Sequence, residues 1–281
     1  MSHASVDVGA YREKGFLVVK GLLSTKRVES ISKELGLLAE RVAEYPPGSF
    51  VLEDNHEEIR KNSRNPLDWI RKIDYPAMSR SRHLMDFFQD GSAEIVRVCA
   101  QLAGERELRL VFLSTFAKPP RAGSEIPWHQ DQALWDLWMQ NAVSGWVALS
   151  RTTDANGALQ VIPGSHARGM APHGHYEGKI HESIRIADYP DARPEKLYMD
   201  PGDVVFFGGK TWHYSGPNRS DERRLGMPVV YAGVNDLKAG LDCDNWLSSK
   251  LRMEKPMTTL PMAETRRRYY EERPVVIAHA L

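Results

Sequence analysis

The sequence has 281 residues, of which 42% are hydrophobic and 26% are charged, as expected of a globular protein with a packed core. Its 37 basic and 37 acidic side chains cancel, so no overall field favours nucleic acid or an anionic membrane surface as a partner. No run approaches the roughly 18 apolar residues of a membrane span, and two cysteines, Cys99 and Cys243, are too few for a disulfide scaffold. We therefore expect a cytoplasmic protein that binds neither nucleic acid nor membrane.

The first third of the chain is predicted to be mainly helical. Ser24 is a good N-cap, and the apolar residues after it recur every three or four positions until Pro46, the pattern of an amphipathic helix. A second helix is predicted from Ala93 to Leu102, because Gly104 is a natural helix-ending residue. Residues 46–79 contain several prolines and many charges, so we expect an irregular segment that is either a lid over a site or a surface loop.

From Glu107 onward, short apolar runs alternate with turn signals such as Pro-Gly and Gly-Ser. The runs are Leu108–Ala117, Gly145–Leu149, Ala158–Ile162, Val204–Phe207 and Val229–Ala232. Several short strands between such turns predict a β-sandwich or open barrel, a class that includes the double-sheet jelly roll. We expect one domain over residues 1–281, with a mainly helical part (1–106), a β core (107–235) and a C-terminal extension (236–281) whose last twenty residues form a solvated helix.

A histidine and an aspartate, His129 and Asp131, stand two residues apart within the predicted β region. Residues two apart in a strand project from the same face, so this pair could hold one cation with an imidazole and a carboxylate together. A non-haem Fe(II) oxygenase uses two histidines and one carboxylate, which leaves positions open for a cosubstrate and dioxygen. The pair alone is a weak signal, because His56 and Glu58 have the same spacing in a charged stretch that we interpret as surface.

The third ligand has to come from a histidine further along the chain. The candidates are His166, His173, His175, His181 and His213. His213 has the best context, because it follows a Pro-Gly-Asp turn, an apolar run and a Gly-Gly turn, and would begin another strand. His166 lies in a Pro-Gly-Ser-His turn, where we expect it to stabilise the turn.

Arg224 offers a partner for a dicarboxylate. The 2-oxo acid end of 2-oxoglutarate can chelate iron, but its far carboxylate would be buried and would need a cation. The planar guanidinium of arginine binds a carboxylate with two hydrogen bonds. From the residues alone, Arg224 could also be a surface arginine and His213 a structural histidine; their joint spacing favours the functional interpretation.

These motifs resemble the phytanoyl-CoA dioxygenase family in their order and spacing. The matching segments are Tyr11–Val19, Lys118–Pro120, Trp128–Asp131, Asn156–His166, Pro201–Asp203 and His213–Ser220, followed by Arg224. One departure is Tyr214, where the family often has glycine. A tyrosine beside an iron ligand would narrow the pocket.

The resemblance implies a fold, a set of cofactors and a site. The fold is a double-stranded β-helix, a cupin-like jelly roll with flanking helices, and the cofactors are Fe(II), 2-oxoglutarate and dioxygen. The implied iron ligands are His129, Asp131 and His213, and the implied cosubstrate contacts are Arg224, Ser215, Trp146 and Lys72, the last in a poorly matching region. Gln130 and Trp135 are predicted on the substrate side, although Trp135 is equally compatible with a core tryptophan.

The predicted activity is oxidation of a C–H bond of a small molecule, with succinate and carbon dioxide as coproducts and hydroxylation as the default outcome. Desaturation, cyclisation and endoperoxide formation differ only in the fate of the substrate radical. Halogenation is disfavoured, because Asp131 fills the position that a halide would need. A zinc hydrolase or a non-enzymatic cupin-like binding protein could use the same three ligands, but neither needs Arg224 and Ser215. These residues do not specify the primary substrate.

Overall fold

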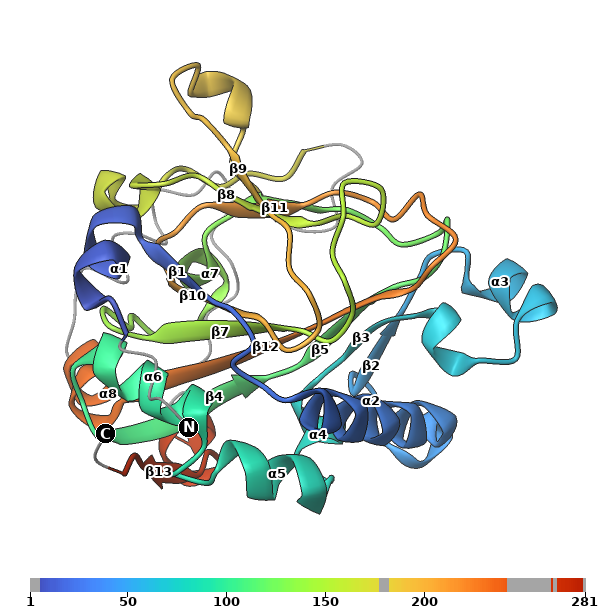
Figure 1. Cartoon of the computed structure of the whole chain (residues 1–281), viewed down its shortest axis with the longest axis horizontal. Coiled ribbons are helices and arrows are strands. Elements are labelled where there is room, and N and C mark those ends of the chain that lie inside the picture. The colour runs from blue at the N-terminus through green and yellow to red at the C-terminus, as the bar shows by residue number, and fades with distance from the viewer. Residues whose placement is uncertain (1–5, 177–181, 242–263, 265–266, 280–281) are drawn as a thin grey trace.

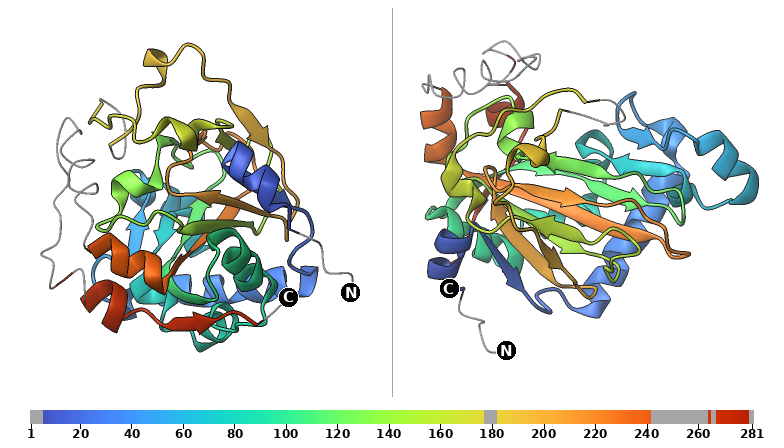
Figure 2. Two further views of the ribbon diagram at one scale, coloured as in Figure 1. Left: turned by 90° about the vertical axis from the view of Figure 1, so that its left-hand side faces the viewer. Right: turned by 90° about the horizontal axis from the view of Figure 1, so that it is seen from above.

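The computed structural model describes residues 6–176, 182–241, 264 and 267–279. Within these residues the chain forms two antiparallel sheets, one of nine strands and one of four. Figure 1 shows the smaller sheet above the larger one, with helices α2, α4 and α5 below, and Figure 2 shows the same layers from two other sides. This arrangement confirms the predicted fold class, a mainly β jelly roll with flanking helices.

The larger sheet is built around a long central strand, β12. Its strand order is β1-β10-β7-β12-β5-β3-β2, and β4 pairs with β12 and β13 beside this path. The strands are β1 (Phe16–Val19), β2 (Phe50–Leu52), β3 (Ile70–Ile73), β4 (Glu107–Leu113), β5 (Thr115–Lys118), β7 (Val143–Ala148), β10 (Val204–Gly208), β12 (Arg224–Gly233) and β13 (Val275–Ile277). All residues of β12 are buried, because helices cover one face of the sheet and the smaller sheet covers the other.

The predicted run from Leu108 to Ala117 is two strands, β4 and β5, that share the partner β12. The break occurs at Ser114, opposite Pro228 of β12. Proline has no N–H to donate, so the ladder is interrupted there, and the Ser114 N–H donates to the Pro228 carbonyl at 3.1 Å.

The smaller sheet has the order β6-β11-β8-β9. Its strands are β6 (Ile126–His129), β8 (Leu159–Val161), β9 (Glu195–Leu197) and β11 (His213–Ser215), and the short helix α7 (Asp131–Leu134) follows β6. The predicted strands that begin at Gly145, Ala158, Val204 and Val229 correspond to β7, β8, β10 and β12. The functional motifs therefore lie mostly on the smaller sheet and on the inner face of β12.

Both predicted helices are confirmed. In α2 the Ser24 side chain accepts a hydrogen bond from the Arg27 N–H at 3.3 Å, and α6 ends at Gly104 in the left-handed conformation with φ of 74°. The helices are α1 (Val8–Lys14), α2 (Thr25–Glu40), α3 (His56–Asn62), α4 (Tyr75–Met78), α5 (Arg82–Phe88), α6 (Glu94–Ala103) and α8 (Val234–Leu241), with short helical turns η1 (Val42–Glu44), η2 (Pro66–Asp68), η3 (Ser165–Arg168), η4 (Ile186–Asp188) and η5 (Arg267–Glu271). Among the described residues, no helix is both long enough and apolar enough to cross a membrane.

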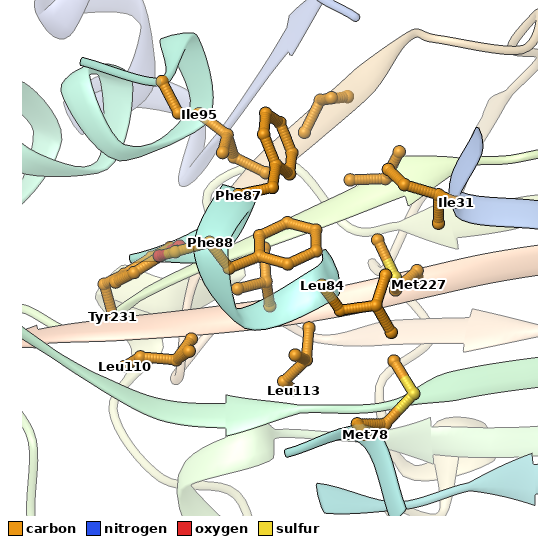
Figure 3. Close-up of a cluster of buried hydrophobic side chains, with 14 of the residues drawn as sticks. Ile31, Met78, Leu84, Phe87, Phe88, Ile95, Leu110, Leu113, Met227 and Tyr231 are labelled. Carbon is orange, nitrogen blue, oxygen red and sulfur yellow. The ribbon is translucent and has the colours of Figure 1, made fainter. Parts of the chain in front are cut away.

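The main hydrophobic core lies between these helices and the outer face of the larger sheet (Figure 3). Side chains from both layers meet there, among them Ile31, Leu84, Phe88, Ile95, Leu110, Leu113, Met227 and Tyr231. A seven-residue helix such as α5 is not stable alone in water. Fully burying a side chain such as Leu84 contributes about 1.5–3 kcal/mol, so packing rather than helix propensity holds this layer in place.

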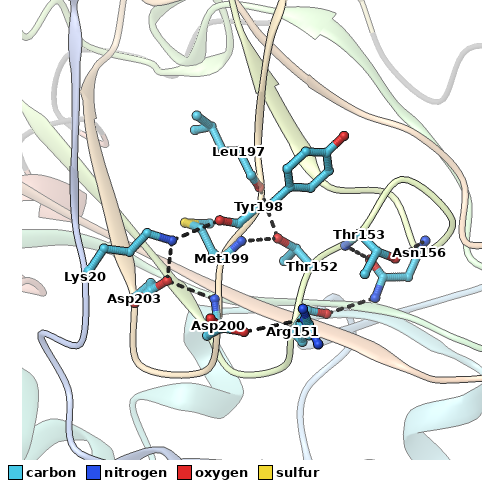
Figure 4. A network of polar contacts seen from close by, with 10 residues as sticks. All are labelled: Lys20, Arg151, Thr152, Thr153, Asn156, Leu197, Tyr198, Met199, Asp200 and Asp203. Atoms are coloured by element: carbon cyan, nitrogen blue, oxygen red, sulfur yellow. Dashed lines mark hydrogen bonds and ion pairs between the residues drawn. The ribbon is translucent and has the colours of Figure 1, made fainter.

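The turns at one edge of the sheets are held by a network of polar side chains (Figure 4). Asp203 of the Pro-Gly-Asp turn accepts a hydrogen bond from the Asp200 N–H at 2.8 Å and pairs with Lys20 at 2.8 Å. Asn156 accepts from the Thr153 N–H at 2.7 Å. The Pro-Gly-Asp and Asn-Gly motifs thus fix turns that lead into the functional strands.

Residues 46–79 are more regular than the sequence indicates. β2 and β3 form a hairpin, and β3 pairs with β5, so that Ile70 and Ile73 are fully buried in the larger sheet. Only α3 and its flanking turns project from the body of the molecule (Figures 1 and 2). The segment is therefore a wall of the sheet with one projecting excursion.

The C-terminal end also differs from the predicted helix. η5 is a short π-helix, and β13 then pairs with β4; Arg266 lies outside the described residues. The guanidinium of Arg273 anchors this end, because it lies 3.4 Å from the centre of the Tyr75 ring and donates to the Val111 carbonyl at 3.1 Å. Arg268 and Tyr269, expected on a solvated face, turn inward instead.

Candidate metal and cosubstrate site

His129 and His213 are cross-strand neighbours in the pairing of β6 with β11, and their ring centres lie 4.0 Å apart. Each ring is oriented by a hydrogen bond from Nδ1, to the Pro127 carbonyl at 2.8 Å for His129 and to the Thr211 carbonyl at 3.0 Å for His213. A proton on Nδ1 leaves the lone pair of Nε2 free, which is the form of histidine that binds metals.

Asp131 completes the cluster from the first turn of α7. Its Oδ1 lies 3.5 Å from Nε2 of both His129 and His213, and the three ligand atoms lie within 4.8 Å of one another. Ser144 on β7 donates to the other carboxylate oxygen, Oδ2, at 3.1 Å and so directs Oδ1 toward the histidines. The donor set fits the two-histidine, one-carboxylate face of a non-haem iron site.

The electrostatics of the cluster favour the same protonation states. Burial lowers the pKa of His129, and the neighbouring His213 lowers it further. Burial raises the pKa of Asp131, but the interactions with His213 and His129 outweigh burial and bring it down to about 2. At neutral pH the site therefore offers a neutral imidazole beside a carboxylate, as metal binding requires.

The three side chains open into a cavity of about 370 Å³ between the two sheets. Arg224, Pro228 and Val230 line it from the inner face of β12, so it follows this strand from Arg224 to Val230, six steps of 3.3 Å or roughly 20 Å. Its walls are mostly apolar and aromatic. Such a cavity can enclose two small ligands beside a metal while keeping water out.

Arg224 closes one end of the cavity. Only 1% of it is exposed, its guanidinium lies 5.2 Å from the Trp146 ring centre, and Nη2 donates to the Gly157 carbonyl at 3.0 Å. Nε and Nη1 have no hydrogen-bond partner within the described residues. Burial lowers the pKa of Arg224 to about 9, which still leaves it charged at neutral pH. A buried cation with unused donors fits a carboxylate ligand.

The other predicted cosubstrate contacts also line this cavity. Trp146 and Ser215 lie with Arg224 along its wall, and the Trp146 ring packs on Gly226, where an added Cβ would meet the ring at 1.9 Å. Lys72 of β3 lines the cavity too, and its Nζ pairs with Asp74 at 2.7 Å. The structure thus brings all four predicted contacts to one cavity.

The two predicted substrate residues lie in different places. Trp135 lines the cavity. Gln130 does not: its side chain donates to the carbonyls of Gly169 at 2.9 Å and Lys210 at 2.8 Å and accepts from the Ala171 N–H at 2.8 Å. The prediction for Gln130 is corrected accordingly, because its amide is used entirely by the backbone and fixes the junction between His129 and Asp131.

Two other histidines have structural surroundings. His173 accepts a hydrogen bond from the Gln130 N–H at 3.0 Å and is not among the residues that line the cavity. His166 lies 3.0 Å from the Arg12 carbonyl and packs on Gly15, in agreement with the predicted turn-stabilising role.

Tyr214, which follows His213, lines the cavity. Its ring stacks on Trp128, and its hydroxyl donates to Glu125 at 3.1 Å.

Several residues at the site are not identified by the sequence analysis. Ser144 is one, and Lys118 is another: it is 2% exposed and donates to the carbonyls of Ser215 at 3.3 Å and Gly216 at 2.7 Å. Burial lowers the pKa of Lys118, and the nearby Arg224 lowers it further. Lys118 belongs to the matching Lys118–Pro120 segment, and it stands in the same alternating register as Phe116, but neither signal assigns it a role at the site. Arg268 and Tyr269 reach the cavity from the C-terminal end and carry no local signal.

Comparison with known proteins gives a consistent result. The sequence model of the phytanoyl-CoA dioxygenase (PhyH) family matches residues 11–226. The peroxisomal phytanoyl-CoA dioxygenase of Rattus norvegicus is 30% identical over 244 residues, covering 81% of this chain and 68% of that enzyme. A probable alpha-ketoglutarate-dependent hypophosphite dioxygenase of Stutzerimonas stutzeri is 26% identical over 246 residues, covering 84% and 80%.

A solved structure shows the same fold. The crystal structure of EctD from S. alaskensis with 2-oxoglutarate and 5-hydroxyectoine has a TM-score of 0.65 and 23% identity, covering 83% of this chain and 78% of that one. The family match extends over most of the chain and includes the segments that carry the histidines, the aspartate and Arg224. The chain therefore belongs to the phytanoyl-CoA dioxygenase family and is an Fe(II)- and 2-oxoglutarate-dependent dioxygenase.

Proposed function

We propose that the protein binds one Fe(II) through His129, Asp131 and His213, holds the distal carboxylate of 2-oxoglutarate with Arg224, and hydroxylates a C–H bond of a small molecule. The bound metal supplies the oxidation by dioxygen, with 2-oxoglutarate converted to succinate and carbon dioxide. The observation that carries the proposal is a buried guanidinium with unused donors in the same cavity as a two-histidine, one-carboxylate cluster.

In this proposal the chain's own side chains bind, orient and exclude water. The Nδ1 hydrogen bonds hold the two imidazoles, and Ser144 holds Asp131. Trp146, Ser215 and Lys72 flank the cosubstrate, while Trp135 stands on the substrate side. The apolar walls keep the cavity dry, which strengthens the pairing of Arg224 with a carboxylate.

The identity of the substrate is not transferred from the relatives. Their names refer to substrates as unlike as phytanoyl-CoA and hypophosphite, so they support a small-molecule substrate and no particular class. We also propose that residues 1–281 act as a single oxygenase domain. From the sequence composition we also propose a cytoplasmic location.

The proposal predicts that the protein converts 2-oxoglutarate to succinate in the presence of Fe(II) and dioxygen. The rate of this conversion is expected to rise when a metabolite panel supplies the primary substrate. Succinate release and product mass are measured together, and a gain of one oxygen atom identifies hydroxylation. A product that has lost two hydrogens identifies desaturation or ring closure. Binding of Fe(II) and 2-oxoglutarate with no succinate under any condition would instead support the non-enzymatic binding protein.

We further propose that residues 46–79, whose strands are held in the larger sheet, act as a lid on the substrate side through the projecting part around α3. Val51, Arg71, Lys72 and Asp74 of this segment line the cavity, while α3 projects outward and carries exposed cleavage sites at Arg60 and Lys61.

Limited proteolysis with Mn(II), which prevents turnover, is expected to show slower cleavage from Arg60 to Arg71 once metal, 2-oxoglutarate and substrate are all bound. The same digestion with metal and 2-oxoglutarate alone is the control. Equal cleavage rates with and without substrate would mean that the excursion is a surface loop.

A further inference from the structure

The wall of the cavity is built partly from residues beyond the family match, which ends at residue 226. Pro228 and Val230 continue β12, and Arg268 and Tyr269 come from η5, far along the chain. None of these four side chains belongs to the proposed metal and cosubstrate contacts, so a change in one of them would leave those contacts in place. This part of the wall is therefore where selectivity for a particular substrate is expected.

Arg268 stands at the entrance. Asp74, Phe112 and Arg268 line both the inner cavity and an adjoining groove of about 920 Å³, so they lie where the two spaces meet. The Arg268 side chain is 38% exposed and is held by Asp136, itself 12% exposed, through Nη1, its one hydrogen bond to a side chain in the part of the protein that the structure describes. This pair fixes the position of the guanidinium while leaving donors of the planar fork for a second anion.

The charges at the entrance are unbalanced. Among the described residues, the cavity lining contains four cations, Arg71, Lys72, Arg224 and Arg268, and two acids besides the metal ligand, Asp74 and Asp136. Arg224 is assigned to 2-oxoglutarate, which leaves three cations for the substrate, of which Arg71 also lies 3.9 Å from the exposed Asp54. Both acids already pair with cations, Asp74 with Lys72 and Asp136 with Arg268. An incoming carboxylate meets an excess of positive charge, whereas an incoming ammonium meets acids that are already neutralised.

The adjoining groove has the opposite balance. Among the described residues it is lined by four acids and two arginines, namely Asp74, Glu264, Glu271, Glu272, Arg268 and Arg273. Glu264 and Glu272 share one neighbouring cation, Arg267, so the groove keeps a small net negative charge. Arg273 is buried against Tyr75 and donates to the Val111 carbonyl, so it is already engaged. The several phosphates of a coenzyme A group would lie against this acidic surface, which disfavours a thioester with its carrier in the groove.

We propose that Arg268 recognises the anionic end of the substrate, and that the substrate is a small amphiphilic carboxylate bound as the free acid rather than as a coenzyme A thioester. The apolar body lies against the inner walls toward the metal, and the carboxylate stays at the entrance with Arg268. This inference rests on the proposed function, because it places the substrate relative to that metal site.

The test uses four probes with one alkyl chain: hexanoate, 1-hexanol, hexylamine and hexanoyl-CoA. Each is titrated by calorimetry into the full-length protein loaded with Mn(II) and N-oxalylglycine, which prevent turnover. Hexanoate is expected to bind most tightly. Arg268→Gln is expected to weaken hexanoate binding about twofold to fivefold, the range for a partly exposed ion pair, and to leave 1-hexanol binding unchanged.

The matched control is Arg267→Gln, because Arg267 is the exposed neighbour and pairs with Glu264 and Glu272 outside the cavity. It is expected to leave the binding of all four probes unchanged. The proposal is wrong if hexylamine or hexanoyl-CoA binds the wild-type protein as tightly as hexanoate, if Arg268→Gln has no effect, or if no probe binds the loaded protein. Failure of the metal site itself is recognised earlier, as absent binding of Mn(II) and N-oxalylglycine before any probe is added.

Discussion

Replacing His213 with alanine is expected to abolish tight Fe(II) binding and, with it, succinate formation. The Nε2 atom of His213 and that of His129 lie at equal distances from the Asp131 carboxylate, so its loss leaves two ligands of the three. Metal sites with four protein ligands bind with about 10–16 kcal/mol, or about 3 kcal/mol for each ligand, which corresponds to a loss of more than about a hundredfold in affinity. Metal titration by calorimetry measures this directly.

His166→Ala is the matched control for His213→Ala. His166 lies within the η3 turn, against the Arg12 carbonyl, and its removal is expected to leave Fe(II) affinity unchanged. Circular dichroism of both variants shows whether the fold survives. Full metal binding in His213→Ala together with loss in His166→Ala would overturn the proposed ligand set.

Arg224→Ala is expected to raise the concentration of 2-oxoglutarate needed for half-maximal turnover by roughly a hundredfold to a thousandfold. Removing one partner of a buried charge pair costs about 3–5 kcal/mol, because the other charge stays buried without a partner. Arg224→Lys is expected to recover little of the affinity for 2-oxoglutarate, because the lysine ammonium cannot form the two parallel hydrogen bonds of a planar guanidinium. The apo fold should persist, since Arg224 makes a single side-chain hydrogen bond to the protein within the described residues.

Arg223→Ala provides the comparison for Arg224→Ala. Arg223 is adjacent in sequence but points to the other side of β12, where it pairs with Asp68 of η2. Its removal is expected to leave the 2-oxoglutarate requirement unchanged and to loosen the excursion around α3. If Arg223→Ala impairs 2-oxoglutarate binding and Arg224→Ala does not, the carboxylate partner has been assigned to the wrong arginine.

Much of the site is readable from the sequence because its parts lie in short motifs. The pair His129 and Asp131 is local, and the turn before His213 marks the start of a strand. The helices α2 and α6 are readable for the same reason, since their end signals at Ser24 and Gly104 are local.

Other features depend on which distant strands become neighbours. Ser144 contacts Asp131 only because β7 faces α7 across the cavity, and Lys118 reaches Ser215 only because the two sheets meet there. The β2–β3 pair within residues 46–79 is stabilised by the pairing of β3 with β5. This contact is non-local, and the mixed charged and apolar residues of the segment do not predict it.

Gln130 differs from these features, because the alternation of side chains along an extended backbone predicts where its side chain points. Asp131 begins α7, but Gln130 still has an extended backbone directly after His129, the last residue of β6, so its side chain points to the side opposite to that of His129. The hydrogen bonds of Gln130 to the backbone at Gly169 and Lys210 follow from that position. Nearness in sequence to two ligands was a poorer guide than the period of the strand.

The pairing of β6 with β11 bears on whether the protein folds before or after it binds iron. His129 and His213 meet only after these strands, distant in sequence, have come together, and such contacts form late because closing long loops is entropically costly. Before that, the chain presents only His129 with Asp131, and two ligands retain iron weakly. With the proposed ligand set, we therefore expect iron to bind to the folded scaffold rather than to nucleate folding, in contrast to a zinc finger. The metal-free protein is accordingly expected to remain folded and to bind Fe(II) when the ion is added.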